Sequence, residues 1–509
     1  MSILRYTASA DNTITNAFNY TLTTRGTGSN MGYADSLEVF SIYGETTSSL
    51  GKSQQLSRIA IEFPVSSISA DRTAGTIPAS GSVSFYLRMY NAEHPFTLPQ
   101  DFTLVVAPIS QSWVEGSGLD MDEYTDKGVS NWISASEGVA WSTVGGDYLS
   151  QDNYNVTFPE GYEDLELDIS EVVENWIKGL SGGEYNNYGF GIRLTSSQEA
   201  YFSSSTGQNT GSIIHNTNGS TDTYYTKKFF ARSTQFFFNR PTIEARWDSR
   251  VQDDRENFYF SSSRAPAEFN LNSLYFYNYV RGGLRNLPPV GTGDLSVSFY
   301  SSSFGAPTGS AISLSAGGST VSAGDTNATA SYVSPGLYSC EVALTAASTA
   351  LQEIHDVWHS GGVEFFTGSF YPELMPTYDS APTFNRITSC KNLKKKYSVQ
   401  DTARFRFFVR DRNWSPTIYT VATANNPTDI IESASFSIER VTDRYTAISY
   451  GTGSDLSTYL SYDKEGNYFD LDMSLLEADY MYEIKLSFYN DSIGAWQEQP
   501  QTFKFRVEE

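Results

Sequence analysis

The chain has 509 residues, with 58 Asp and Glu against 34 Lys and Arg and a formal net charge of −24. At about 150 residues per domain, this length corresponds to three to four domains, and the acidic balance disfavours binding to nucleic acid or to anionic membranes. Aromatic residues make up 15% of the chain and charged residues only 18%, a composition that suits half-buried pleated strands and predicts an all-β fold.

The N-terminus, MSILRYTASADNT, lacks the basic region and apolar run of an export signal, and no segment approaches about 18 uninterrupted apolar residues. We therefore expect neither Sec-type export nor membrane insertion. The two cysteines, Cys340 and Cys390, could form one disulfide, but two reduced and buried thiols are the favoured interpretation.

Residues 1–248 read as short strands separated by Gly, Ser and Asn turns, which predicts a β-sandwich. One helix is expected over Asp168–Leu180. Its predicted apolar face consists of Ile169, Val172, Val173, Trp176 and Ile177. Asp168 and Glu171 resemble a capping box, and Gly179 can close the last turn in the left-handed conformation.

The remaining sequence contains three weak internal matches in the same order and at nearly the same spacing. They pair Leu274–Arg281 with Ala403–Arg410, Tyr338–Leu344 with Tyr480–Leu486, and Trp358–Phe365 with Trp496–Phe503. Such a repeat predicts two related immunoglobulin-like β-sandwiches in tandem, over residues 249–385 and 386–509. The prolines of Tyr371–Gln400 predict a linker between them.

Two tyrosine patterns stand out in this part of the chain. Tyr482 follows Leu476 by six residues, which resembles the tyrosine corner of immunoglobulin-like sandwiches; an ordinary strand tyrosine is the alternative. Further upstream, Tyr275, Tyr277 and Tyr279 alternate with apolar residues. That face could anchor a partner, or both faces of the strand could be covered within the domain.

The sharpest metal candidate is His355-Asp-Val-Trp-His359, because two imidazoles at i and i+4 of a helix can share one zinc ion. Asp356 stands where the HExxH motif needs Glu. A short connecting helix ending at Gly361, with incidental histidines, is the favoured interpretation, and we expect no zinc there.

Hard oxygen ligands cluster in two acidic loops that could hold calcium. One loop contains Asp120, Asp122 and Asp126, and the other contains Asp463, Glu465 and Asn467. Neither has the EF-hand order, so solvated acidic turns are favoured in both places. No cofactor is expected.

No sequence pattern argues for catalysis. Walker-type GxxxxGK[ST], GxSxG and paired CxxC motifs do not occur in the chain. The basic run Lys394–Lys396 could touch DNA or an acidic neighbour, but in so acidic a chain it is better explained as a solvated linker or a local contact with another subunit.

The N-terminal half resembles the DNRLRE-type jelly-roll domain, which is similar to carbohydrate-binding modules. The resemblance rests on Ala10–Asn12, Arg58–Phe63, Trp113 with Glu115, Trp132, Trp141, Leu167–Ile169, Trp176, Asn187–Gly191, Phe229–Arg232 and Arg240–Ile243. It implies an adhesive role, without catalysis, for residues 1–248.

Most of the chain also resembles virion structural proteins of marine tailed bacteriophages, with contractile-tailed cyanophages the closest match. This second resemblance rests on Arg5–Asn12, Thr23–Gly32, Leu37–Tyr43, Ser461–Asp463 and Gly466–Asp470. It implies a non-enzymatic virion subunit assembled in the host cytoplasm, and it does not place the subunit within the particle. Because chains of several sandwiches suit adaptors and fibre attachments, we expect multiple copies bound to other virion proteins in the tail, neck or baseplate. The alternative is an adhesin that binds host-surface glycan through the jelly roll; most tryptophans, however, are expected in sandwich cores.

Overall fold

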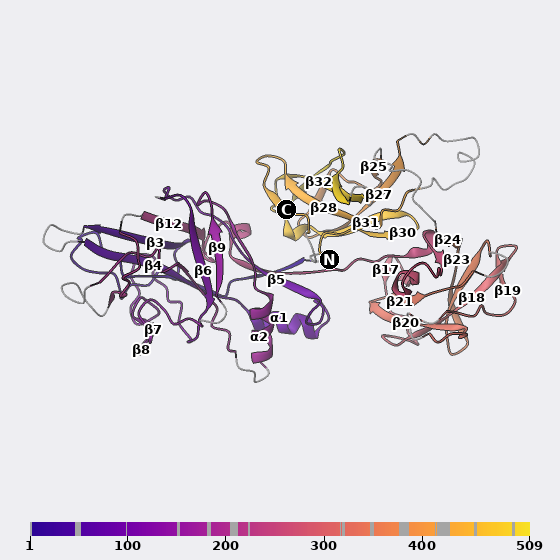
Figure 1. The fold of residues 1–509 in the computed structure, drawn as a ribbon, viewed down its shortest axis with the longest axis horizontal. Coiled ribbons are helices and arrows are strands. Elements are labelled where there is room, and N and C mark those ends of the chain that lie inside the picture. Colours follow the sequence, from indigo (N-terminus) through magenta and orange to yellow (C-terminus); the bar gives the residue numbers. More distant parts are fainter. Residues whose placement is uncertain are drawn as a thin grey trace. The chain divides into compact units, whose positions relative to one another are not determined.

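A computed structural model describes residues 3–509 except 46–51, 98, 150–152, 181–184, 204–211, 222–223, 316, 318–320, 347–350, 376–385, 413, 415–427, 452–455 and 491–493. The chain forms two compact units, Ser2–Asp248 and Ser249–Glu509 (Figure 1). Strands dominate both units, so the protein is all-β. None of the described helices is long and apolar enough to cross a bilayer.

The first unit is a jelly roll of antiparallel strands. Its strands are β1 (Ile3–Thr7), β2 (Ala10–Thr15), β3 (Ser36–Glu45), β4 (Lys52–Glu62), β5 (Val83–Met89), β6 (Phe102–Pro108), β7 (Ser134–Ser136), β8 (Val139–Ala140), β9 (Tyr154–Phe158), β10 (Leu165–Asp168), β11 (Phe190–Leu194), β12 (Tyr224–Phe230) and β13 (Thr242–Trp247). One sheet has the order β1-β13-β5-β10, and the other has the order β12-β3-β4-β11-β6-β9, with β2 also paired to β4. The chain therefore passes repeatedly between two facing sheets, as in jelly rolls.

Alternation along the strands explains how the two sheets close on one core. In β5, Val83, Phe85, Leu87 and Met89 are buried while the residues between them are partly exposed. These four side chains belong to a single buried cluster shared with both sheets. The period of two places one apolar face of each strand inside the sandwich.

The predicted helix is confirmed as α2 (Ser170–Gly179), although both of its expected end signals are wrong. Its N-cap is Ile169 and has no side-chain cap hydrogen bond, whereas Asp168 ends β10 and accepts from the N–H and hydroxyl of Ser170. Trp176 lies in the core, with its ring centroid 4.8 Å from that of Phe190. Gly179 does not adopt the left-handed conformation; a Cβ there would lie 1.8 Å from the Tyr185 carbonyl oxygen, so close packing explains the glycine. A second helix, α1 (Val65–Thr73), was not expected from the sequence.

The second unit contains two immunoglobulin-like sandwiches. The strands of the first are β14 (Tyr259–Phe260), β15 (Asn272–Tyr277), β16 (Tyr279–Val280), β17 (Gly283–Leu284), β18 (Leu295–Ser303), β19 (Ala306–Thr308), β20 (Asn327–Ser334), β21 (Leu337–Val342), β22 (Ile354–Ser360), β23 (Val363–Phe370) and β24 (Glu373–Leu374). Those of the second are β25 (Arg386–Cys390), β26 (Lys396–Ser398), β27 (Thr402–Asp411), β28 (Ala434–Arg440), β29 (Thr446–Ile448), β30 (Ser461–Asp463), β31 (Gly466–Asp472), β32 (Met481–Asn490), β33 (Ala495–Glu498) and β34 (Phe503–Glu508).

The two sandwiches repeat one topology. The order β15-β21-β20 corresponds to β27-β31-β30, and β18-β22-β23 corresponds to β28-β32-β34. Each sandwich also has one short parallel pair, β14 with β24 and β26 with β34. The two differ in that β20 of the first sandwich also pairs with β18, which joins its strands into one continuous sheet, whereas the second has two separate sheets. Two layers of strands with a parallel edge pair are typical of immunoglobulin-like domains.

Two of the three sequence matches nevertheless align strands that do not correspond. Leu344 follows β21, whereas Leu486 lies in β32, whose counterpart is β22. Trp358 lies in β22, whereas Trp496 lies in the edge strand β33. The expected alignment is therefore wrong at these positions, because alternating aromatic and apolar residues fit any strand of a sandwich equally well.

The first match joins corresponding strands, β15 and β27, but it extends too far. Val280 lies beyond β15 in the short strand β16 and is 49% exposed. Val409 is buried within β27. The equivalence of these two valines is therefore also wrong.

The tyrosine corner is confirmed. Tyr482 begins β32 just after the 3-10 helix η5 (Met473–Leu475), and its hydroxyl donates to the Glu477 carbonyl oxygen at 3.1 Å. The Glu477 backbone N–H donates to the same hydroxyl at 3.0 Å. The phenol thus pins the connection between the two sheets to the strand that follows it.

The predicted linker is wrong over half of its described length. Strands β24, β25 and β26 all fall within Tyr371–Gln400. Pro376 and Pro382, which motivated the prediction, lie outside the described residues. The short strands β24 and β26 form the edge pairs of their sandwiches, a position that proline-rich sequence permits.

Hydrogen bonds join the two immunoglobulin-like sandwiches around the 3-10 helix η3 (Asp254–Glu256). The Tyr462 hydroxyl donates to the Asp254 carboxylate at 2.9 Å. On the backbone, the Asp253 N–H donates to the Tyr462 carbonyl oxygen at 3.1 Å, and the Tyr462 N–H donates to the Val251 carbonyl oxygen at 3.0 Å. Residues 251–254 thus extend the hydrogen bonding of the last sandwich.

A buried ion cluster fixes the same segment to the first of the two immunoglobulin-like sandwiches. Arg255 binds Asp253, donates to Asp356 at 2.6 Å and donates to the Tyr275 carbonyl oxygen at 2.7 Å. Trp358 donates to Asp356 at 2.7 Å. We call this set of five residues the η3 junction cluster.

Candidate functional site

A layer of loops covers the outer face of β4, β11 and β6 in the jelly roll, and three tryptophans hold it in place. Their indole N–H groups donate to backbone carbonyl oxygens: Trp113 to Tyr188, Trp132 to Ser212, and Trp141 to Asn131, at 2.8–2.9 Å. All three are buried, but in clusters separate from the sandwich core. The expectation that tryptophans fill sandwich cores is wrong for these three, which pack loops against the sheet instead.

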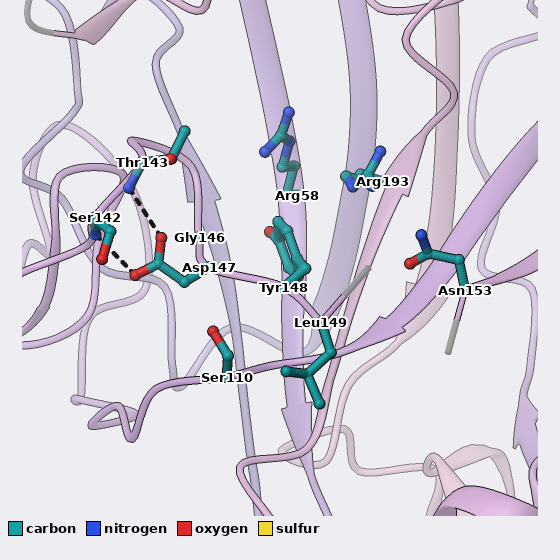
Figure 2. Close-up of a pocket in the computed structure, with 10 residues that line it drawn as sticks. All are labelled: Arg58, Ser110, Ser142, Thr143, Gly146, Asp147, Tyr148, Leu149, Asn153 and Arg193. Carbon is teal, nitrogen blue, oxygen red and sulfur yellow. Dashed lines mark hydrogen bonds between the residues drawn. The ribbon is translucent and has the colours of Figure 1, made fainter. Parts of the chain in front are cut away.

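A cleft of about 430 Å³ lies beside this layer (Figure 2). Its lining comes from β4, β11, the segment after β6, the loop over 142–149 and the segment before β9. The lining residues are Arg58, Ser110, Ser142, Thr143, Gly146, Asp147, Tyr148, Leu149, Asn153 and Arg193. We call this feature the Tyr148 cleft.

Glycines allow Tyr148 to lie flat against the sheet. Gly145 and Gly146 turn the preceding loop with positive φ of 86° and 104°. A Cβ at Gly191 in β11 would lie 1.9 Å from Cε1 of Tyr148. The aromatic ring therefore occupies space that any side chain at position 191 would fill, and its hydroxyl donates to the Gly145 carbonyl oxygen at 2.5 Å.

Two guanidinium groups flank this ring, and they differ in their partners. Arg58 lies 5.8 Å from the Tyr148 ring centroid and donates to both carboxylate oxygens of Glu199 at 2.9 Å. Arg193 lies 5.4 Å from the same centroid. Among the described residues, no carboxylate lies within ion-pair distance of Arg193. Burial, and then the charge of Arg58, lower the pKa of Arg193, an effect that Glu199 offsets in part.

The other polar groups of the cleft are short side chains that can donate and accept hydrogen bonds. The Asp147 carboxylate accepts from the backbone N–H groups of Ser142 and Thr143 at 2.7 and 2.9 Å, which closes the loop (Figure 2). The hydroxyls of Ser142 and Thr143 and the amide of Asn153 line the opening, where all three residues are exposed. Chemically, the cleft is equipped to bind a hydrogen-bonding ligand that carries negative charge.

Sequence reasoning did not single out this cleft. Arg58, Tyr148 and Arg193 are separated by up to 135 positions and come together only through sheet pairing. One signal was available: in Phe190-Gly-Ile-Arg-Leu194, an arginine interrupts an otherwise apolar strand. An arginine in such a position needs a partner or a solvent-filled space on the outer face of the sheet.

The first acidic loop is a self-contained turn. The Asp120 carboxylate accepts from the backbone N–H groups of Asp122, Glu123 and Tyr124 at 2.7–3.0 Å, and these bonds lower the pKa of Asp120. Asp126 instead accepts from the backbone and hydroxyl of Ser117. The predicted ligands therefore do not converge.

The second acidic loop is also divided among other partners. Asp463 forms a two-pronged ion pair with Arg406 at 2.6 and 2.9 Å. Asn467 exchanges two hydrogen bonds with the Ile431 backbone, and the Glu465 side chain is largely exposed. Across the described part of the chain, no group of three His, Cys, Asp or Glu side chains is arranged to hold a metal ion.

The predicted helix at His355–His359 is wrong, because this segment is strand β22. Four residues of a strand span about 13 Å, which separates the two histidines. His355 contacts the Gly368 carbonyl oxygen and the Ser302 hydroxyl, whereas His359 contacts the Ser298 hydroxyl. The i, i+4 spacing therefore does not form a shared metal site.

The cysteines are both free, but only one is buried as expected. Cys340 lies in a core strand, where burial raises the pKa of its thiol. Cys390 is half-buried at the end of β25, so the expectation of a second buried thiol is wrong. Its exposure follows from its position on an edge strand.

The tyrosine face near residue 275 is mostly covered within the chain. Tyr275 and Tyr277 are half-buried, and Tyr468 of the last sandwich is among the neighbours that raise the pKa of each, after burial itself. Tyr279 remains 54% exposed. The face is therefore mostly covered, but by the neighbouring sandwich and not within its own domain, as the alternative supposed.

The basic run Lys394–Lys396 makes local contacts. Lys394 lies 5.9 Å from the Tyr397 ring centroid, and the Lys396 ammonium lies 2.7 Å from the Glu508 carboxylate. Lys396 belongs to strand β26 and not to a linker.

No protein-family model matches the chain, and no curated protein is similar to it in sequence. Among solved structures, the Ig1-2 module of the Drosophila receptor protein tyrosine phosphatase DLAR is 11% identical, covering 47% of this chain and 91% of that module at a TM-score of 0.14. Native α-2-macroglobulin of Escherichia coli is 8% identical at a TM-score of 0.15; the match covers 97% of this chain but only 28% of that protein. Likenesses at these TM-scores carry no functional argument.

Proposed function

We propose that the chain is a non-enzymatic structural subunit of a tailed-bacteriophage virion, present in multiple copies in the tail, neck or baseplate and assembled in the host cytoplasm. The observation that carries this proposal is the connection between the two immunoglobulin-like sandwiches around η3. Tyr462 of the last sandwich forms hydrogen bonds with residues 251–254, and the η3 junction cluster holds the same segment to the other sandwich. A linked pair of sandwiches suits a spacer between other virion proteins. The resemblance of the sequence to phage virion proteins supports the same assignment.

An exposed aromatic cluster on the last sandwich offers a contact for such a partner. Trp496 in the edge strand β33 is 40% exposed, and its ring lies 5.2 Å from Tyr459 and 5.5 Å from Tyr489. Tryptophan and tyrosine are the residues most enriched among energetic anchors of protein interfaces. We therefore assign assembly contacts to this cluster in place of the covered tyrosine face.

Replacing Trp496 with Ala tests this assignment in particles. We expect markedly fewer copies of the variant per particle, with Tyr279→Ala as a control that removes another exposed aromatic ring from the same unit. Quantitative mass spectrometry of purified particles provides the measurement. Equal incorporation of the two variants would contradict the assignment.

The Tyr148 cleft favours a second candidate function, a glycan-binding adhesin that acts through the jelly roll. The cleft is within the size range of small-ligand sites. Its hydroxyl, amide and guanidinium groups suit a sugar. A glycan array probed with the full chain tests this candidate separately from particle assembly.

A further inference from the structure

We infer that the Tyr148 cleft binds a sugar carboxylate, with Arg193 as its anchor. This inference rests on the second candidate function and names the ligand class and the residue that would recognise it. The argument depends on how charge is distributed within the cleft, and it begins with the two arginines.

Arg58 already has its counter-charge. It is 6% exposed, forms a two-pronged ion pair with Glu199, and donates a third hydrogen bond to the Gly145 carbonyl oxygen at 3.1 Å. Its charge and most of its donors are therefore committed to holding the loop and the sheet together. Arg58 is therefore not available as the main ligand contact.

Arg193 differs because its hydrogen-bond donors have no acceptor among the described residues. Its guanidinium lies over the Tyr148 ring, which holds it at the outer face of β11. The guanidinium lines the cleft, where water or a ligand can reach its donors. A planar ligand carboxylate matches the donor geometry of the guanidinium in two-pronged fashion.

Among the described lining residues, Asp147 is the one carboxylate, and it is engaged by the Ser142 and Thr143 backbone N–H groups. Because Glu199 balances the charge of Arg58, Arg193 is the cation of the described lining that is left for a ligand. Because the whole chain carries −24, a densely charged polyanion would be repelled at longer range. We therefore assign the cleft to isolated acidic sugars, such as a uronic acid within an otherwise neutral glycan.

The remaining lining distinguishes a sugar from a simple anion. Ser110, Ser142 and Thr143 offer hydroxyl groups around the opening, and Leu149 supplies an apolar surface for sugar C–H groups. Such groups both donate and accept, as sugar hydroxyls do. Acetate or inorganic phosphate would use the arginine and leave these groups to water.

Saturation-transfer NMR with the full chain provides the test, using glucuronate and galacturonate as ligands, glucose and galactose as matched neutral sugars, and acetate and inorganic phosphate as competing anions. We expect the uronates to bind at least about tenfold more tightly than the neutral sugars. They should also bind more tightly than acetate or phosphate. Equal binding of glucuronate and glucose, or displacement of glucuronate by equimolar phosphate, would overturn the inference.

Variants then assign the contact to Arg193. Arg193→Gln should weaken glucuronate binding about tenfold or more, and Arg193→Lys should weaken it less, because it keeps the charge but loses the planar fork. Lys178→Gln on the exposed face of α2 removes the same charge outside the cleft and should leave binding unchanged. Unaltered binding by Arg193→Gln, or an equal loss in Lys178→Gln, would overturn the assignment. Thermal unfolding of each variant separates lost binding from lost folding, and none of these results bears on incorporation into particles.

Discussion

The replacement of Arg255 with Met is the strongest test of the junction between the immunoglobulin-like sandwiches. The side chain of Arg255 is 8% exposed and that of Asp356 is fully buried, with 2.6 Å between their nearest charged atoms. The substitution keeps much of the side-chain volume but removes the guanidinium. It leaves the Asp356 and Asp253 carboxylates without their cation and the Tyr275 carbonyl oxygen without this donor.

The expected magnitude follows from the burial of this cluster. Removing one partner of a buried ion pair costs about 3–5 kcal/mol, because the remaining charge stays desolvated. We therefore expect Arg255→Met to lower the free energy of unfolding of the second unit by that amount. Adding Asp356→Asn should recover part of the loss, because the uncompensated charge is then removed as well.

A matched control is Arg404→Met in the last sandwich. Arg404 also forms a two-pronged ion pair, with Asp470 at 2.8 and 2.9 Å, but both side chains are about one-third exposed. Solvent screening limits such a pair to about 1 kcal/mol or less. Urea unfolding of the full chain, with hydrogen exchange to identify which unit unfolds, gives the comparison. A loss below about 1 kcal/mol for Arg255→Met, or no recovery in the double variant, would refute the reasoning.

Three further predictions address single features of the fold. Tyr482→Phe should lower the free energy of unfolding by about 1–3 kcal/mol, because two backbone groups lose the hydroxyl as partner; Tyr279→Phe should change little, and equal effects in urea would contradict the tyrosine corner. Burial raises the pKa of Asp254 to about 6. Its contribution to the free energy of unfolding is therefore complete below its unfolded pKa of about 4 and is lost as the pH rises through 6. Asp254→Asn should reduce the fall in the free energy of unfolding between pH 5 and 7 by about 1 kcal/mol, and an unchanged pH profile would count against this. Gly191→Ala should displace the Tyr148 ring and lower the midpoint temperature of thermal unfolding. Gly28→Ala should do neither, because a Cβ at Gly28 meets nothing within 4 Å. A Gly191→Ala variant with unchanged stability and an intact cleft would disprove the packing argument.

Local patterns sufficed where the relevant contacts are near in sequence. The apolar residues around Trp176 predicted α2 from the sequence, because they recur at the spacing of one helical face. The α1 segment, Val65–Thr73, has just two buried residues, Val65 and Ile68, and no clear stripe. Its helix depends on tertiary packing, so the sequence pattern could not predict it.

The error at His355–His359 has a different physical origin. In β22 Ile354, Asp356 and Trp358 are buried on one face, as a period of two places them, and His355 on the other face is buried as well. Asp356 made this pattern hard to recognise in the sequence, because a charged residue is not expected in a core. Its charge is met by Arg255, 101 positions away, so only the folded chain explains its burial.

The candidate site depended even more on distant contacts. Arg193 and Tyr148 are near each other because β11 pairs between β4 and β6 and the preceding loop folds back over that face. The spacing of Arg193 and Tyr148 in the sequence does not predict that they are neighbours in the fold. The acidic loops, by contrast, were visible as clusters, yet each carboxylate is satisfied locally or by an arginine.

Locating the chain in purified phage particles tests the proposed function most directly. Particles carrying a tagged copy of the chain can be analysed by quantitative mass spectrometry and imaged by electron microscopy with a label against the tag. We predict several copies per particle at a fixed position in the tail, neck or baseplate, and loss of a morphological component when the gene is deleted. Particles that lack the chain, or that keep their form without it while losing cleavage of host polysaccharide, would contradict a structural role.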